Sequence, residues 1–154
     1  MATQFDSEYK EGTIDTRLWI EEHDWLYALL KSEKNISPTF RFPDLISACV
    51  SIVFATPDAY QRVFDFLGAD LVLRHPNNPR RHVSIWMAQY DLLLKLQHSP
   101  ANRHPHPNFQ LDQLTTACVA LSRQNDASGA DVLRQARINM AGRFTRKKEV
   151  QLSS

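Results

Sequence analysis

Two short stretches of this 154-residue chain, residues 37–42 and 106–111, carry polar side chains at every second position. Phe40, Phe42, Phe109 and Leu111 stand at positions between them. Hydroxyl, guanidinium and amide groups donate and accept hydrogen bonds, so this pattern favours recognition of a polar surface over bond-making chemistry. Ser37 and His106 begin the two polar rows, and the candidate contact residues in them are Thr39, Arg41, Asn108 and Gln110.

Other chemistry has little support in the sequence. His98, His104 and His106 lie in a proline-rich loop without a cysteine or acid beside them, so we expect no metal site. The chain has four glycines and no glycine-rich phosphate loop, and both cysteines fall on apolar helical stripes rather than next to a base. We therefore expect neither an enzyme nor a bound cofactor.

An internal repeat organises the chain. Residues 38–50 and 107–119 are identical at six of thirteen positions, and Cys49 and Cys118 occupy the same position of the repeat. At a slightly shorter offset, Trp19 matches Trp86. One interpretation is a duplicated unit, and the other is chance likeness between two amphipathic helices. Duplication predicts a flexible tail over 1–14, one domain over 15–143 and a basic tail over 144–154. The domain would contain repeats 15–73 and 83–143 joined by a basic linker, 74–82.

Helical spacing of apolar residues and capping signals predict three helices in each repeat. Pro43 suits a first helical turn, Thr56-Pro57-Asp58 is a helix start, and Gly142 is a helix stop. Alternation predicts a strand after the leading helix of each repeat. The predicted helices cover 15–34, 43–55, 57–73 and 83–98, with two more after residue 111, the last beginning at Asn125 or Asp126.

A single short strand leaves its backbone groups without partners, so the strands at 37–42 and 106–111 are expected to pair with each other. The predicted fold is mainly α with a two-stranded antiparallel ribbon. It is a duplicated helix–strand–helix–helix unit arranged around a pseudo-two-fold axis. Pairing within one chain and strand exchange between two chains both remain open.

Composition is that of a soluble globular protein, with 43% hydrophobic and 23% charged residues. No apolar run reaches the roughly 18 residues of a membrane span, and no charged-then-apolar leader opens the chain. These features predict a cytoplasmic protein without a membrane partner. In that reducing compartment Cys49 and Cys118 are expected to be buried free thiols.

Charge is distributed unevenly along the chain. Residues 1–73 contain 6 Lys/Arg and 12 Asp/Glu, a net charge of −6, whereas residues 74–154 contain 12 Lys/Arg and 5 Asp/Glu, a net charge of +7. The asymmetry is typical of a chain whose basic half meets a polyanion. Electrostatic matching between the two halves of the chain explains it equally well.

The order of strand, helix start at a proline or acid, short capped turn and longer helix resembles the ribbon-helix-helix DNA-binding family of the Arc type. The stretch Pro38-Thr39-Phe40-Arg41-Phe42-Pro43 carries the resemblance, which covers about 37–73 and 106–143. Most members are dimers that give one strand each. This chain resembles a single-chain version, as in some plasmid-transfer proteins. Its leading helices are additional to the family pattern, and its turn lacks the frequent glycine.

The resemblance implies sequence-specific binding of double-stranded DNA through the ribbon in the major groove, as a transcriptional regulator or a plasmid or mobile-element accessory protein. Arg41 would contact guanine, Asn108 and Gln110 adenine, and Thr39 several bases. The pseudo-dimer would act as a monomer or self-associate further on DNA. The remaining expected contacts are to phosphates, from Thr56, Asn125, Arg80, Arg81, Arg103, Arg146 and Lys147.

Two alternatives remain open. The alternating polar residues also fit an ordinary solvated strand face. The chain as a whole also fits a protein-interaction module, antitoxin-like or an assembly adaptor, in which the helices hold a protein partner and the ribbon binds no DNA.

Overall fold

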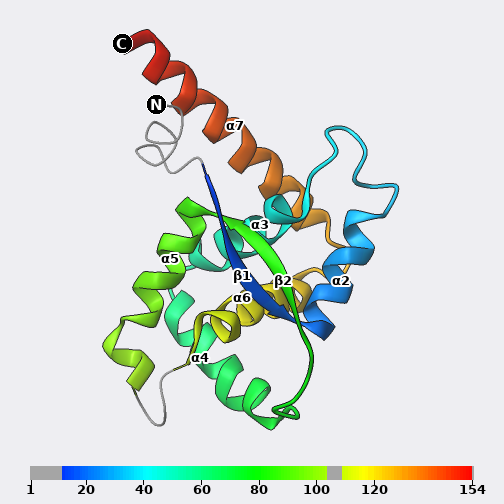
Figure 1. The fold of residues 1–154 in the computed structure, drawn as a ribbon, viewed down its shortest axis with the longest axis vertical. Helices are drawn as coiled ribbons and strands as arrows, with labels where there is room; N and C mark the ends of the chain where they lie inside the picture. Colours follow the sequence, from blue (N-terminus) through cyan, green and yellow to red (C-terminus); the bar gives the residue numbers. More distant parts are fainter. Residues whose placement is uncertain (1–11, 104–108, 154) are drawn as a thin grey trace.

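The computed structural model describes residues 12–103 and 109–153, and the side chains of all these except residues 103 and 146–153. Over these residues the protein is mainly helical, with one two-stranded antiparallel sheet. The strands are β1 (Thr13–Trp19) and β2 (Arg80–Trp86). Each is followed by three α-helices (Figure 1). The helices are α2 (Ile20–Leu30), α3 (Phe42–Phe54), α4 (Ala59–Ala69), α5 (Met87–Gln97), α6 (Leu111–Asn125) and α7 (Ala130–Ser153), with short 3₁₀ turns η1 (Leu71–Leu73) and η2 (Pro100–Arg103).

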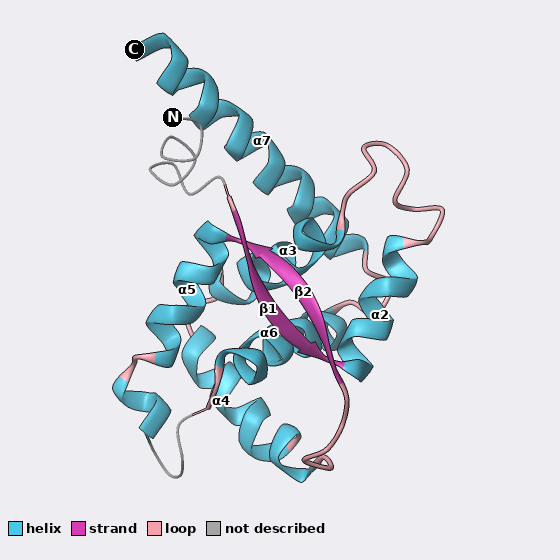
Figure 2. Cartoon of the chain, in the orientation of Figure 1, coloured by secondary structure: helices cyan, strands magenta, loops and turns pink. Residues whose placement is uncertain are grey.

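The sheet lies across the helices, with α3 and α6 behind it in the view of Figure 2. Its register is symmetric about the pair Thr16–Val83, and Thr13 faces Trp86 at one end while Trp19 faces Arg80 at the other. Thr16 and Val83 are themselves 67 residues apart, which is the offset between the two tryptophans. The inward face packs on the core through Ile14, Leu18, Val83 and Ile85.

The expected position of the strands was wrong. Segment 13–19 alternates inward Ile14, Thr16 and Leu18 with outward residues, so it pairs as a strand instead of starting the leading helix at residue 15. The helical stripe begins only with α2. In the same way β2 begins at Arg80, inside the segment expected to be a linker, and takes up the first residues of the helix expected from 83.

Residues 37–42 form no strand, although their alternation predicted one. Phe40 is 1% exposed, and its backbone groups find their partner in the side chain of Asn35. Phe40 N donates to Asn35 Oδ1 over 2.7 Å, and Asn35 Nδ2 donates to Phe40 O over 3.0 Å. One amide side chain thus replaces the strand partner that buried backbone groups otherwise require. In the second stretch, 106–108 lie outside the described residues, Phe109 and Gln110 are not in a strand, and α6 begins at Leu111.

Helix ends agree in part with the capping signals. Pro43 lies in the first turn of α3 as expected, and Asp44 Oδ2 accepts from Arg41 N at that end. The helix expected over 57–73 is shorter, as α4, and is followed by η1. Gly142 does not end α7, which continues to Ser153, because Gly142 does not adopt the left-handed conformation that stops a helix there.

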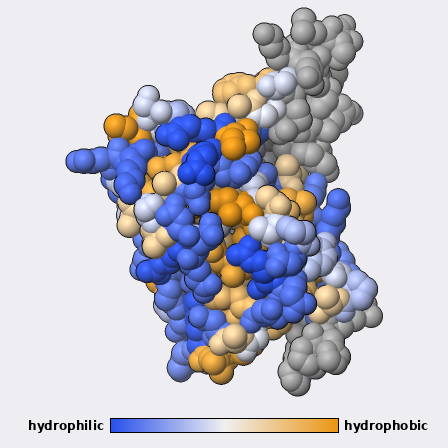
Figure 3. Space-filling view, turned by 180° about the vertical axis from the view of Figure 1, so that it is seen from behind, coloured by the Kyte–Doolittle hydropathy of each residue, from blue (hydrophilic) through white to orange (hydrophobic). Residues whose placement is uncertain are grey.

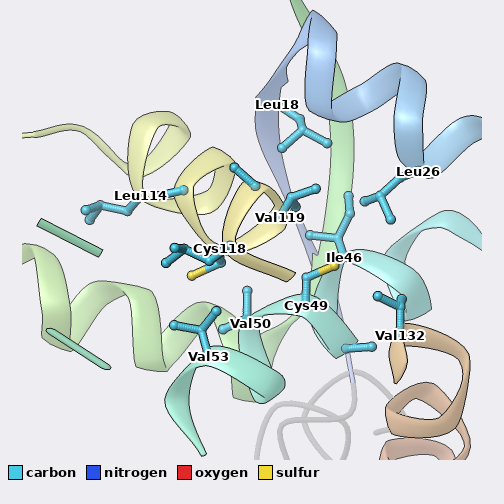
Figure 4. Packing of buried hydrophobic residues seen from close by; sticks show 14 of the residues in the cluster. Leu18, Leu26, Ile46, Cys49, Val50, Val53, Leu114, Cys118, Val119 and Val132 are labelled. Carbon is cyan, nitrogen blue, oxygen red and sulfur yellow. The ribbon is translucent and has the colours of Figure 1, made fainter. Parts of the chain in front are cut away.

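The core is built around α3 and α6, which pack against each other. Cys49 and Cys118 are fully buried in it as free thiols, which confirms the expectation for both (Figure 4). Burial raises the pKa of the Cys49 thiol to about 12 and also raises that of the Cys118 thiol. Both cysteines are therefore packing residues at neutral pH.

Candidate nucleic-acid interface

The outward face of the sheet is a polar surface to which both halves of the chain contribute. We call it the ribbon face and define it as Thr13, Asp15, Arg17, His82 and Ser84. Four of these side chains are exposed and Ser84 is half-buried. Arg17 faces His82 across the sheet, and Ser84 Oγ lies 3.4 Å from Asp15 Oδ1. The ribbon face therefore presents exposed hydrogen-bond donors and acceptors from both strands.

Trp19 fixes one end of the ribbon to the second half of the chain. Its backbone N donates to Thr116 Oγ1 over 3.1 Å, and its indole Nε1 donates to Asp112 Oδ2 over 3.2 Å. Both acceptors lie on α6. The carboxylate also forms an ion pair with Arg80, whose guanidinium carbon lies 3.9 Å from the Trp19 ring centroid.

Trp86 fixes the other end to the first half in the same way. Its backbone N donates to Ser47 Oγ over 3.0 Å, and its Nε1 donates to Asp44 Oδ1 over 2.8 Å. Here Arg143 from α7 covers the ring, with its guanidinium carbon 4.0 Å from the centroid, and donates to Asp44 Oδ1 over 3.1 Å. Each strand thus ends on a helix of the opposite half.

Two hollows lie beside the ribbon, one along its middle and one at its Trp86 end, and the N-terminus of α6 or α3 borders each. The hollow beside Arg17 and His82 has a volume of about 400 Å³ and includes Gln110 and Asp112 at the start of α6. The hollow beside Trp86 has a volume of about 300 Å³ and includes Thr39 and Arg41, just before α3. The ribbon face is therefore flanked by the N-termini of α3 and α6.

Of the four residues expected to read bases, the three that the structure describes are not on the ribbon. Thr39 lies in a loop where its hydroxyl donates to Ile36 O over 3.2 Å, Arg41 is the N-cap of α3, and Gln110 is the N-cap of α6. Asn108 lies outside the described residues. For Thr39, Arg41 and Gln110 the expected strand was wrong, because the Asn35 amide takes the backbone groups of Phe40 and the equivalent amide of Asn102 takes those of Phe109.

The expected phosphate contacts are scattered. Thr56 Oγ1 donates to Val53 O in the turn after α3, and Asn125 donates to Asp131. Arg80 packs on the Trp19 ring and forms an ion pair with Asp112, whereas Arg81, the second residue of β2, is exposed. Arg103 belongs to η2, and Arg146 and Lys147 to α7, but the described side chains do not include these three.

Sequence reasoning missed Asp15, Arg17, His82 and Ser84. The signal was present in the alternation of Ile14, Thr16 and Leu18, and in the match between Trp19 and Trp86. Both were assigned to a leading helix because the leucines of α2 follow without a break.

Within the described residues, no single helix has the length and apolar character to cross a membrane. Only α3 taken together with the segment Ala59–Leu73, a pair bent by 110°, passes such a test on length and composition. Comparison with known protein families, curated proteins and solved structures found no match to the chain.

Proposed function

We propose that this protein binds double-stranded DNA, without catalysis, by placing β1 and β2 in the major groove. The observation that carries the proposal is a two-stranded antiparallel ribbon whose outward face is polar and exposed. A ribbon of this kind fits the major groove, which is about 12 Å wide and presents a different donor and acceptor pattern for each base pair. Two strands about 4.8 Å apart, with side chains extending from them, have a matching width.

The outward side chains supply the chemistry for base recognition. Arg17 has a guanidinium suited to the O6 and N7 acceptors of guanine, and Asp15 has acceptors suited to the N4 amino group of cytosine. His82 and Ser84 lie opposite them and can donate or accept. These four residues replace Thr39, Arg41, Asn108 and Gln110 as the proposed base-reading set.

The flanking hollows would meet the DNA backbone. The starts of α3 and α6 border these hollows, where Arg41 and Gln110 lie near the carboxylates of Asp44 and Asp112. Arg41 and Gln110, at those starts, are proposed to contact phosphates. Arg81, Arg146 and Lys147 remain proposed phosphate contacts as well, since any basic residue near the groove contributes a sequence-independent term.

We further propose that the fold is a duplicated ribbon-helix-helix pseudo-dimer in one chain. The symmetric register about Thr16–Val83 and the reciprocal contacts of Trp19 and Trp86 support this. In this proposal each strand is followed directly by its helices, so the order within a repeat is strand–helix–helix–helix. The proposed roles remain transcriptional regulation or service to a plasmid or mobile element.

The test is selection from random duplexes, followed by fluorescence anisotropy on the selected and a scrambled duplex across salt concentrations. Arg17→Ala should weaken binding to the selected duplex by about 1–3 kcal/mol, or about five- to 150-fold. Arg123→Ala is the matched control. It is an exposed arginine near the far end of α6, about 10 Å along the helix from Thr116, which contacts the ribbon, and should change affinity little.

Equal affinity for selected and scrambled duplexes would overturn sequence-specific recognition. Non-specific DNA binding has a Kd of about 10⁻⁴–10⁻⁶ M at physiological salt and is tighter at low salt. Absence of any binding at low salt would therefore overturn DNA binding altogether and favour the protein-interaction module.

Figure 3 shows the face away from the ribbon, on which hydrophobic residues lie among hydrophilic ones. Among the residues whose side chains the structure describes, the large exposed apolar ones, over the whole surface, are Tyr27, Ile36, Tyr60, Val72, Leu73, Ile138 and Phe144.

A further inference from the structure

The ribbon face is chemically polarised along its length, although its backbone register is symmetric. Under the 67-residue offset Asp15 corresponds to His82, and Arg17 corresponds to Ser84. The cross-strand pair Asp15–Ser84 is therefore the symmetry counterpart of the pair Arg17–His82. One pair consists of a carboxylate and a hydroxyl, and the other of a guanidinium and an imidazole.

We infer that the protein reads a non-palindromic DNA site and binds it in a single orientation. The inference rests on the proposed function. An ionised carboxylate only accepts hydrogen bonds and a guanidinium only donates them, so Asp15 and Arg17 have opposite requirements for the groups they meet. Their counterparts on β2 do not reproduce these requirements. Rotating the DNA by a half-turn about the Thr16–Val83 pair would thus exchange favourable partners for unfavourable ones.

The distance between Asp15 and Arg17 along β1 determines how far apart the base pairs that they contact should lie. Residues two apart on a strand are separated by about 6.8 Å, and base pairs rise by about 3.4 Å. Asp15 and Arg17 should therefore read base pairs about two steps apart, on opposite sides of the pseudo-two-fold position. Guanine is the expected base at the Arg17–His82 side, and cytosine at the Asp15 side, on the strand each residue contacts.

The ends of the ribbon are unlike as well. At the Trp19 end, Arg80 of β2 covers the ring, whereas its counterpart at the Trp86 end is the short Thr13. Arg143 of α7 covers that ring instead. The flanks that approach the DNA backbone consequently carry different groups, which adds to the discrimination between the two orientations.

The experiment makes the ribbon face symmetric. The double variant His82→Asp with Ser84→Arg gives β2 the same outward acid and arginine as β1. Selection from random duplexes should give a non-palindromic consensus for the natural chain and a palindromic one for the double variant. The variants Asp15→Asn and Arg17→Lys, which keep the size of each side chain, should each relax preference at one side of the natural consensus only. Circular dichroism and thermal unfolding check that each variant remains folded.

The orientation of the protein on its DNA site is measured independently by attaching a DNA-cleaving reagent to a single exposed thiol. Asn77→Cys places one in the exposed loop before β2, at the Trp19 end, while Cys49 and Cys118 are buried and should stay unlabelled. Cleavage on one side of the site is expected for the natural ribbon face, and on both sides for the symmetric variant.

A palindromic consensus for the natural chain, or two-sided cleavage by it, would overturn a single orientation. A non-palindromic consensus that persists in the double variant would show that these four residues are not its source. Failure to enrich any duplex would instead count against the proposed function itself, so the two failures are distinguishable.

Discussion

Trp86 Nε1 donates a hydrogen bond to Asp44 Oδ1 over 2.8 Å, which ties the last residue of β2 to the first turn of α3. The same carboxylate accepts from Arg143 and from the backbone N of Arg41. At the other end of the ribbon Trp19 donates to Asp112, although the residue that matches Asp44 in the repeat is Gln113. The ion pair of Asp112 with Arg80 is longer, at 3.6 Å, and more exposed. At each end of the ribbon a carboxylate thus accepts from a tryptophan and pairs with an arginine, and the pair at the Trp86 end is the more buried.

Asp44→Ala should lower the free energy of unfolding by about 3–5 kcal/mol, because it removes a buried carboxylate that pairs with Arg143 and also accepts from Trp86 Nε1 and the backbone N of Arg41. Asp112→Ala should cost about 1–2 kcal/mol, since Arg80 is partly solvated. Denaturation in urea measures both. Equal losses for the two variants would contradict the difference in burial on which this prediction depends.

Gly129, in the turn before α7, adopts a positive φ of 80°. A Cβ there would lie 2.7 Å from Leu29 Cδ1. Gly129→Ala should therefore destabilise the fold by about 1–3 kcal/mol through backbone strain and the clash. Gly68→Ala is the matched control, because nothing lies within 4 Å of its added Cβ in α4, and it should stabilise by about 0.5–1 kcal/mol. Thermal unfolding should shift in opposite directions for the two variants.

The helices that carry the core could be predicted from sequence because their apolar residues recur with helical spacing over two or more turns. α3 and α6 were expected close to their observed bounds, and the burial of Cys49 and Cys118 was confirmed. The fold class, mainly α with a two-stranded antiparallel sheet, was also confirmed.

The candidate site could not be predicted, because two segments competed for the role of strand. Both 13–19 and 37–42 alternate, and alternation alone does not show which backbone finds a partner. The decision depends on long-range contacts such as Trp19 N to Thr116 Oγ1, and on a local one, the Asn35 amide at Phe40. Neither has a periodic signature in sequence.

The buried thiols predict how stability depends on alkaline pH. Each thiol has a folded pKa above its ordinary value of 9.0, reaching about 12 for Cys49, so the neutral form is favoured in the folded state. Their contribution is complete below about pH 9 and is lost as pH rises toward 12, because the unfolded chain releases these protons first. The expected slope is up to about 1.4 kcal/mol per pH unit for each thiol.

Urea denaturation between pH 8 and pH 11 measures this slope, and the variant Cys49→Ala with Cys118→Ala should show a shallower one. At pH 8 neither native thiol should react with a disulfide reagent within minutes, whereas both should react in denaturant. Fast labelling of the native protein would show that the cysteines are accessible and would sink this account.

Asn35 and Asn102 hold equivalent loops, and their substitution tests why residues 37–42 are not a strand. Each side chain makes three hydrogen bonds to backbone, Asn35 with Leu30 and Phe40, and Asn102 with Gln97 and Phe109. Asn35→Ala should lower the free energy of unfolding by about 2–4 kcal/mol, because it leaves the N–H and C=O of Phe40 buried without partners.

Asn102→Ala should cost less than Asn35→Ala, since Phe109 is only half-buried whereas Phe40 is 1% exposed. Asn77→Ala, at an exposed asparagine, is the control and should stay within about 0.5 kcal/mol of the natural chain. Urea denaturation gives all three values, and amide exchange at Phe40 gives the local effect. If Asn35→Ala unfolded no more easily than Asn77→Ala, the Asn35 amide would not be what replaces the missing strand partner of Phe40.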